Sequence, residues 1–188
     1  MASSLSDQEL RNTWMRSPAV RAFEGGNMPP AEFGQAITEE FGLSVSGDDF
    51  IAQFKTWPKG FYPGAQALVE HLRQYYRVGC LSNSNSLHWG LHIESLFDFA
   101  YSSHLTGFMK PDAAAFEHVA REQGVHAGAI CFFDDSVINV DAARRVGMEA
   151  YHTFGFEGLV RTLEKRLDID LPPDHRIQPS SRKNGAGG

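Results

Sequence analysis

The sequence predicts an α/β protein built on a parallel β-sheet with helices on both faces. Apolar runs at 78–81 and 129–133 have the length and composition of buried strands, and weaker strands are expected at 99–102 and 148–152. Segments with helical periodicity lie between and around these strands, at 64–76, 112–123, 139–146 and 159–167. Strands that alternate with helices in this way form parallel sheets, because each connection crosses a face of the sheet.

The chain is expected to divide into three parts. Residues 5–56 are predicted to be helical: Ser6 and Glu9 have capping-box spacing, Pro29-Pro30 opens a second helix and Ser46 precedes a third. An α/β core is expected at 57–171. Residues 172–188 are polar and rich in Pro, Ser and Gly, and a disordered tail is predicted there.

Composition restricts the function classes. The net charge of −6 is modest and spread along the chain, which argues against a nucleic-acid partner. No apolar run has the length of a membrane span, and no signal peptide is visible, so a soluble cytoplasmic protein is expected. Cys80 and Cys131 each lie in a predicted strand, and two buried, reduced thiols are expected.

Two candidate binding residues follow a predicted strand and a third precedes a predicted helix. Ligands of parallel α/β sheets bind beyond the carboxyl ends of the strands. Ser82 and Asn83 directly follow strand 78–81, where a hydroxyl and backbone amides could receive a phosphate. Lys110 comes just before helix 112–123 and could neutralise a phosphoryl group. The alternatives are a polar turn for the first two and a surface charge for Lys110.

An acidic pair ends the most apolar strand. Asp134 and Asp135 follow strand 129–133, and adjacent carboxylates repel each other unless a cation offsets their charge. Mg²⁺ suits such a site, because it takes few protein oxygens and keeps its waters and a substrate phosphate. Asn139 can add a supporting amide. The alternative is a helix-capping Asp with a solvated neighbour.

Taken in order, these segments resemble the motifs of the haloacid dehalogenase-like superfamily, in its sugar-phosphatase-like and epoxide-hydrolase-N-domain-like branch. The resemblance covers roughly residues 8–165. The segments that resemble its second, third and fourth motifs are Leu81 to Trp89, Gly107 to Asp112 and Phe132 to Ala143.

The resemblance implies a Rossmann-like core, a small helical cap at 5–56 and a role for each candidate residue. Ser82 would bind phosphate, and Lys110 would pair with the nucleophile and the phosphate. Asp135 would be the Mg²⁺ ligand, supported by Asp134 and Asn139. The family typically hydrolyses phosphate monoesters of small metabolites through an aspartyl-phosphate, and a few members are dehalogenases.

One motif of that family has no counterpart in the sequence. The family's first strand ends in Asp-x-Asp, which supplies a nucleophile and a general acid–base. Asp168 and Asp170 have this spacing but follow a polar helix, and Asp48-Asp49 is better explained as a helix start. A mis-assigned start, a splice variant or a truncation would each account for the difference, and little phosphatase activity is expected.

The missing strand would lie in the middle of the sheet. Strands 78–81 and 129–133 would then either close together or leave backbone groups unpaired, with self-association through the exposed edges.

Three functions stay open from the sequence. They are a Mg²⁺-dependent phosphatase, a non-catalytic relative that binds phosphate, metal or a partner, and a dehalogenase. The acidic pair argues against the last, because dehalogenation needs no cation there. Trp57 and Phe61-Tyr62 line the entrance or pack as a hinge.

Overall fold

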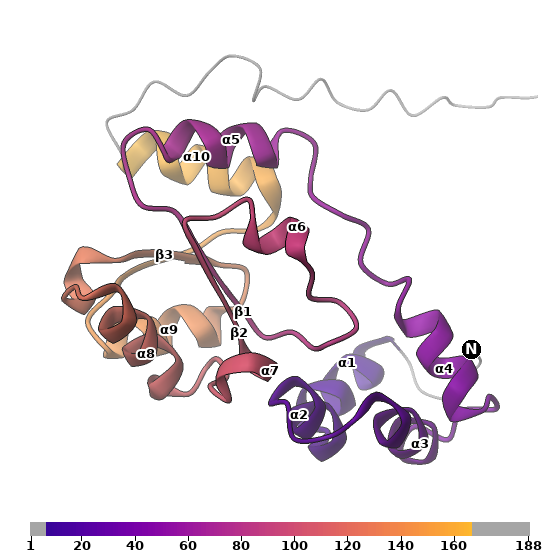
Figure 1. Cartoon of the computed structure of the whole chain (residues 1–188). Helices are drawn as coiled ribbons and strands as arrows, with labels where there is room; N and C mark the ends of the chain where they lie inside the picture. Colours follow the sequence, from indigo (N-terminus) through magenta and orange to yellow (C-terminus); the bar gives the residue numbers. More distant parts are fainter. Residues whose placement is uncertain (1–6, 167–188) are drawn as a thin grey trace, which may run out of the picture.

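The computed structural model describes residues 7–166, and the predicted tail, Ser6, Asp168 and Asp170 lie outside this range. Its first part is helical (Figure 1), with helices α1 (Asp7–Arg16), α2 (Pro18–Glu24), α3 (Pro30–Glu40) and α4 (Gly47–Phe54). The Ser46 hydroxyl accepts a hydrogen bond from the Asp49 N–H, which caps α4 as the sequence predicted. Helix α2 was not predicted, although Ser17 caps it and Pro18 opens it.

Aromatic side chains hold the four helices together. The rings of Phe23 and Phe33 stack with centroids 4.1 Å apart, and Phe50 and Phe54 are also almost fully buried. Helices α3 and α4 approach closely at a glycine: a Cβ atom on Gly34 would lie 2.6 Å from a backbone oxygen of the next helix. This first part therefore has an aromatic core of its own.

The second part alternates strands and helices. The strands are β1 (Gly79–Ser82), β2 (Phe99–Ser102), β3 (Cys131–Asp134) and β4 (Glu149–His152). The main helices are α5 (Ala65–Leu72), α8 (Ala113–Gln123), α9 (Val137–Arg145) and α10 (Gly155–Arg166), with short helices α6 (Leu91–Glu94), α7 (Ser103–Thr106) and a 3₁₀ turn at Ala127–Ala129. Strand β1 pairs in parallel with β2, and β3 pairs in parallel with β4, which confirms the α/β class.

Helices cover the strands from two sides (Figure 1). Helices α5 and α10 bury Leu68 and Phe156 against Val78, just before β1, and against Phe133 of β3. Helices α8 and α9 lie on the other side, where Leu81 of β1 and Phe132 of β3 join one buried cluster; its buried members are Phe116, Val140, Ala142, Ala143, Met148 and Ala150. Both strand pairs therefore share the same two helical layers.

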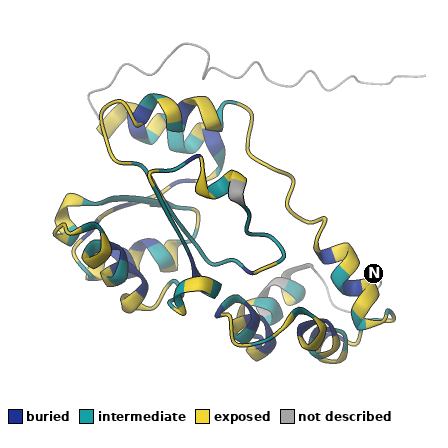
Figure 2. Cartoon of the chain, viewed as in Figure 1, coloured by how far each residue is buried: buried dark blue, intermediate teal, exposed yellow. Residues whose placement is uncertain are grey.

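The single sheet expected from the sequence is divided. Among residues 7–166 the strands form two sheets of two, and β1 and β3 are not hydrogen-bonded to each other. Within the part of the chain that the structure describes, each of these two strands is paired along one edge. Their apolar side chains, including Leu81, Phe132 and Phe133, stay only partly buried (Figure 2). Of the two outcomes expected from the sequence, unpaired edges are the one observed among the described strands.

Two composition-based predictions can be compared with the fold. Cys80 and Cys131 are free thiols, as predicted, and are partly rather than fully buried. Within the described residues, no helix combines the length and apolar character needed to cross a membrane.

Candidate functional site

The loop after β1 fixes the backbone of Lys110. The Asn83 side-chain amide donates to the Lys110 carbonyl at 2.8 Å, and its oxygen accepts from the Lys110 N–H at 2.9 Å. Both polar atoms of the Asn83 side chain are therefore used to hold the segment before α8. The Asn83 side chain thus positions Lys110, and phosphate binding by the Asn83 backbone amide stays a prediction from the sequence.

Lys110 and Asp134 form a buried ion pair at the carboxyl end of β3. The Nζ donates to Asp134 Oδ2 at 2.7 Å, and the side chains are 11% and 7% exposed. The ammonium also lies 5.5 Å from the centre of the Phe132 ring. Asp134 Oδ1 accepts from the Ser136 N–H and from the Asn139 side-chain amide, both at 2.9 Å. Asp134 is thus held by one charged and two neutral donors.

Ser82 and Asp135 lie beside this pair without touching it. Ser82 ends β1, and among the described residues its hydroxyl reaches the Asn83 carbonyl at 3.4 Å, too long to fix it firmly. Asp135 is exposed, and its backbone carbonyl lies 3.0 Å from His152 Nε2. Its carboxylate has no hydrogen bond or ion pair with any described residue. Hydrogen bonds thus join four of the six predicted residues, Asn83, Lys110, Asp134 and Asn139. Ser82 and Asp135 are their neighbours along the chain, and their place in a common site stays a prediction.

The two carboxylates at the end of β3 are not equally available to Mg²⁺. The Asp134 carboxylate is occupied by three donors, so Asp135 carries the carboxylate left over for a cation. Among residues 7–166 no group of three or more His, Cys, Asp or Glu side chains could hold a metal ion. Mg²⁺ is commonly bound by one or two carboxylates, its own waters and a substrate phosphate, and this donor set matches that pattern.

Ser103 was not predicted from the sequence. It begins α7 and bonds both the loop after β1 and the end of α2. It is fully buried, accepts from the Ser84 N–H at 3.0 Å and donates to the Glu24 carbonyl at 2.6 Å. It therefore ties the loop after β1 to the end of α2. A sequence signal existed: Ser102-Ser103 ends a predicted strand at the same edge as Ser82.

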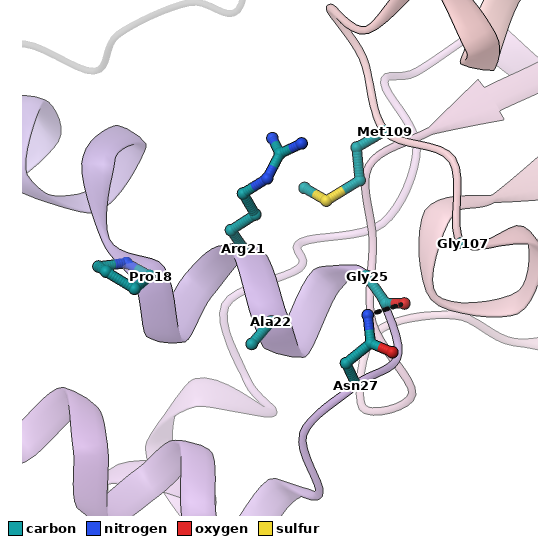
Figure 3. A pocket seen from close by; sticks show the side chains of 7 residues that line it. All are labelled: Pro18, Arg21, Ala22, Gly25, Asn27, Gly107 and Met109. Carbon is teal, nitrogen blue, oxygen red and sulfur yellow. Dashed lines mark hydrogen bonds between the residues drawn. The ribbon is translucent and has the colours of Figure 1, made fainter.

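A hollow of about 360 Å³ separates α2 from the segment that leads to Lys110 (Figure 3). The Arg21 side chain extends over it toward Met109 and reaches Asp112 at 2.6 Å. Both charged side chains are about half exposed, so this ion pair adds little stability. It does link the helical part to the start of α8.

Burial and charge also affect a thiol in β1. Cys80 lies in β1, and burial raises its pKa, while the positive charge of Lys110 acts in the opposite direction. The Lys110 charge therefore acts on both strands whose ends form the site.

Together, the fold and the site define a parallel α/β protein with a buried Lys–Asp pair and an exposed carboxylate where two strands end. A family model described as haloacid dehalogenase-like hydrolase matches residues 28–147. The chain therefore belongs to the haloacid dehalogenase-like hydrolases, as its motifs predicted.

Similar proteins carry phosphatase names. The chain is 30% identical over 131 residues to Phosphatase MT3486 of Mycobacterium tuberculosis, covering 65% of this chain and 60% of that protein. It is 30% identical over 148 residues to the sesquiterpene phosphatase astK of Aspergillus oryzae, covering 74% of each. The chain thus spans somewhat less than two thirds of the first relative and about three quarters of the second.

A solved structure shares the fold. It is a HAD family enzyme of Bacteroides thetaiotaomicron, crystallised in complex with magnesium and inorganic phosphate. The TM-score is 0.66 at 26% sequence identity, covering 78% of this chain and 80% of that one.

Proposed function

We propose that this chain carries the phosphate-binding half of a Mg²⁺-dependent phosphate-monoester phosphatase that acts on a small phosphorylated metabolite. The observation that carries the proposal is the buried Lys110–Asp134 pair, fixed by Asn83. An ammonium group has three N–H donors, and Asp134 takes one of them, so the others are available to phosphate oxygens. A positive charge shielded from water interacts more strongly with a phosphate than one in open solvent, and the Asp134 carboxylate offsets part of that gain.

Asp135, with Asp134 and Asn139 behind it, would hold the Mg²⁺. When bound, the ion would neutralise phosphate charge beside the Lys110 ammonium. Its presence in the Bacteroides relative supports this assignment. Ser82 stands at the end of β1, where its hydroxyl can turn to donate to a phosphate oxygen.

Turnover by the chain of 188 residues is expected to be low. Attack on phosphorus needs a carboxylate aimed in line, and the described strands end in one acidic pair only. In that pair Asp134 is bonded to three donors, and Asp135 is assigned to the cation. Phosphate binding without rapid hydrolysis, as in a non-catalytic relative, is the outcome that this arrangement supports.

The unpaired edges of β1 and β3 support a further part of the proposal, that copies of the chain self-associate. Unpaired strand edges present rows of free N–H and C=O groups, which pair readily with other strands. A cytoplasmic location and the absence of nucleic-acid and membrane partners stay predictions from the sequence.

The test is calorimetric titration of the full chain with inorganic phosphate in the presence of Mg²⁺. We expect saturable binding that weakens at least tenfold in Lys110→Met and is unchanged in Lys59→Met. Lys59 is an exposed lysine whose ammonium donates to the Thr56 carbonyl and, among the described residues, forms no ion pair, which makes it a matched control. Equal affinity in the wild type and Lys110→Met would refute the proposal.

A further inference from the structure

A second cavity opens beside Asn83, between the helical part and the core. Its volume is about 260 Å³. One side comes from α1, α2, α4 and the chain after α4, and the other from the loop after β1. The residues that line it are Trp14, Glu24, Phe54, Trp57, Pro58, Asn83, Ser84, Asn85 and His88.

The first side is an aromatic wall. The Phe54 ring lies 4.9 Å from that of Trp57 and 5.8 Å from that of Trp14, and the two tryptophan rings lie 5.6 Å apart. Phe54 is buried, whereas Trp57 is 45% exposed. Trp57 therefore packs on the helical part and also presents apolar surface to the cavity. A half-exposed indole beside a cavity can gain burial when a ligand binds.

The wall is fixed to the loop of the phosphate site. His88 Nε2 lies 2.8 Å from the Phe54 carbonyl, and the two rings are 4.2 Å apart. The same loop carries Asn83, which is bonded to Lys110. The cavity and the site proposed for phosphate thus share Asn83, which lines the cavity and is bonded to the Lys110 backbone.

The lining contains no Lys or Arg. Its carboxyl group belongs to Glu24, and burial raises the pKa of that group, which favours the uncharged form. A second anionic group would therefore find neither a lysine nor an arginine to pair with in this cavity. The volume equals that of roughly nine liquid waters, enough for an alcohol of about ten non-hydrogen atoms.

We propose, resting on the phosphate site proposed above, that this cavity binds the leaving group of the substrate and selects phosphate monoesters of apolar or aromatic alcohols. Trp57, Phe54 and Trp14 would contact the hydrocarbon, and the phosphate would extend past Asn83 to Lys110. Trp57 is the residue that determines specificity, because it combines contact with the cavity and exposed apolar surface.

The test measures the affinity of the full chain, with Mg²⁺ present, for 1-naphthyl phosphate, glycerol 3-phosphate and inorganic phosphate. Binding does not require turnover, so calorimetry serves as the readout. We expect the naphthyl ester to bind at least tenfold more tightly than the glycerol ester. In Trp57→Ala that preference should fall below threefold while inorganic phosphate binds as before, and Trp57→Phe should retain most of it.

Trp89→Ala is the matched control, because Trp89 is outside the cavity lining and bonds Glu94 through its indole N–H at 2.8 Å. It should leave the preference unchanged. Equal affinity for the two esters in the wild type, with inorganic phosphate still bound through Lys110, would overturn the leaving-group proposal and leave the phosphate site standing. A wild type that does not bind inorganic phosphate would overturn both the phosphate site and the leaving-group proposal.

Discussion

Replacing Lys110 by Met should destabilise the fold as well as weaken phosphate binding. The Asp134 side chain is 7% exposed, and Lys110 is its one charged partner among the described residues. Breaking a buried ion pair by removing one partner typically costs about 3–5 kcal/mol, because the other charge is left uncompensated. Two neutral donors, from Ser136 and Asn139, still reach Asp134 in the variant, so we expect the lower end, about 3 kcal/mol.

The assay is urea unfolding followed by circular dichroism in a double-mutant cycle. The double variant Lys110→Met/Asp134→Asn removes both charges and should lie within about 1 kcal/mol of the wild type. Asp134→Asn alone should also be destabilised, because it leaves the ammonium without its carboxylate. Single variants that each cost less than about 1 kcal/mol and add up in the double variant would refute the account of a buried pair.

Three further predictions concern the surroundings of this pair. Asn83→Ala should weaken binding of inorganic phosphate several-fold while Lys110 remains present, because the Lys110 backbone loses both of its hydrogen bonds to the Asn83 side chain. Calorimetry measures this affinity, and an unchanged value would contradict the positioning role of Asn83. Burial raises the pKa of Cys131 to about 11, and the negative charge of Glu149 acts in the same direction. The thiolate fraction at pH 8 is therefore below that of an ordinary thiol, and alkylation of Cys131 should accelerate mainly near pH 11. Mass spectrometry of iodoacetamide-treated protein measures the rate, and rapid alkylation at pH 8 would contradict the prediction. Light scattering after size exclusion should give a mass that rises with protein concentration, and a constant monomer mass over the micromolar range would exclude self-association through the strand edges.

Much of the core could be predicted because its sequence signals are local. Apolar runs beside Gly79 and before Asp134 marked β1 and β3 to within two residues. Lys110 was found by its place before a helix. The helix α2 was missed because it is short, although Ser17-Pro18 is a capping signal that could have revealed it.

The choice of Asp134 rather than Asp135 as the ion-pair partner of Lys110 depends on tertiary structure, which local sequence does not encode. The sequence treated Asp134 and Asp135 as one acidic pair with Asp135 as the main residue. In the fold, β3 ends at Asp134, which is directed to Lys110, while Asp135 follows the strand and stays exposed. Which of two adjacent carboxylates meets a lysine 24 residues away depends on strand register and helix packing. The separation of β1 and β3 into two sheets also depends on tertiary structure, because a strand edge is paired or left open by segments far away in the sequence.

We propose that Lys110 organises a phosphate site and that no carboxylate of residues 7–166 is placed to attack a bound phosphate. Steady-state hydrolysis of 4-nitrophenyl phosphate with Mg²⁺ tests this most directly, with the Lys110→Met variant alongside. The account predicts that the wild type hydrolyses the ester at close to the rate of buffer alone, even where calorimetry detects bound phosphate. Turnover well above that rate, and abolished in Lys110→Met, would contradict it and would make Asp168 and Asp170 the first residues to replace.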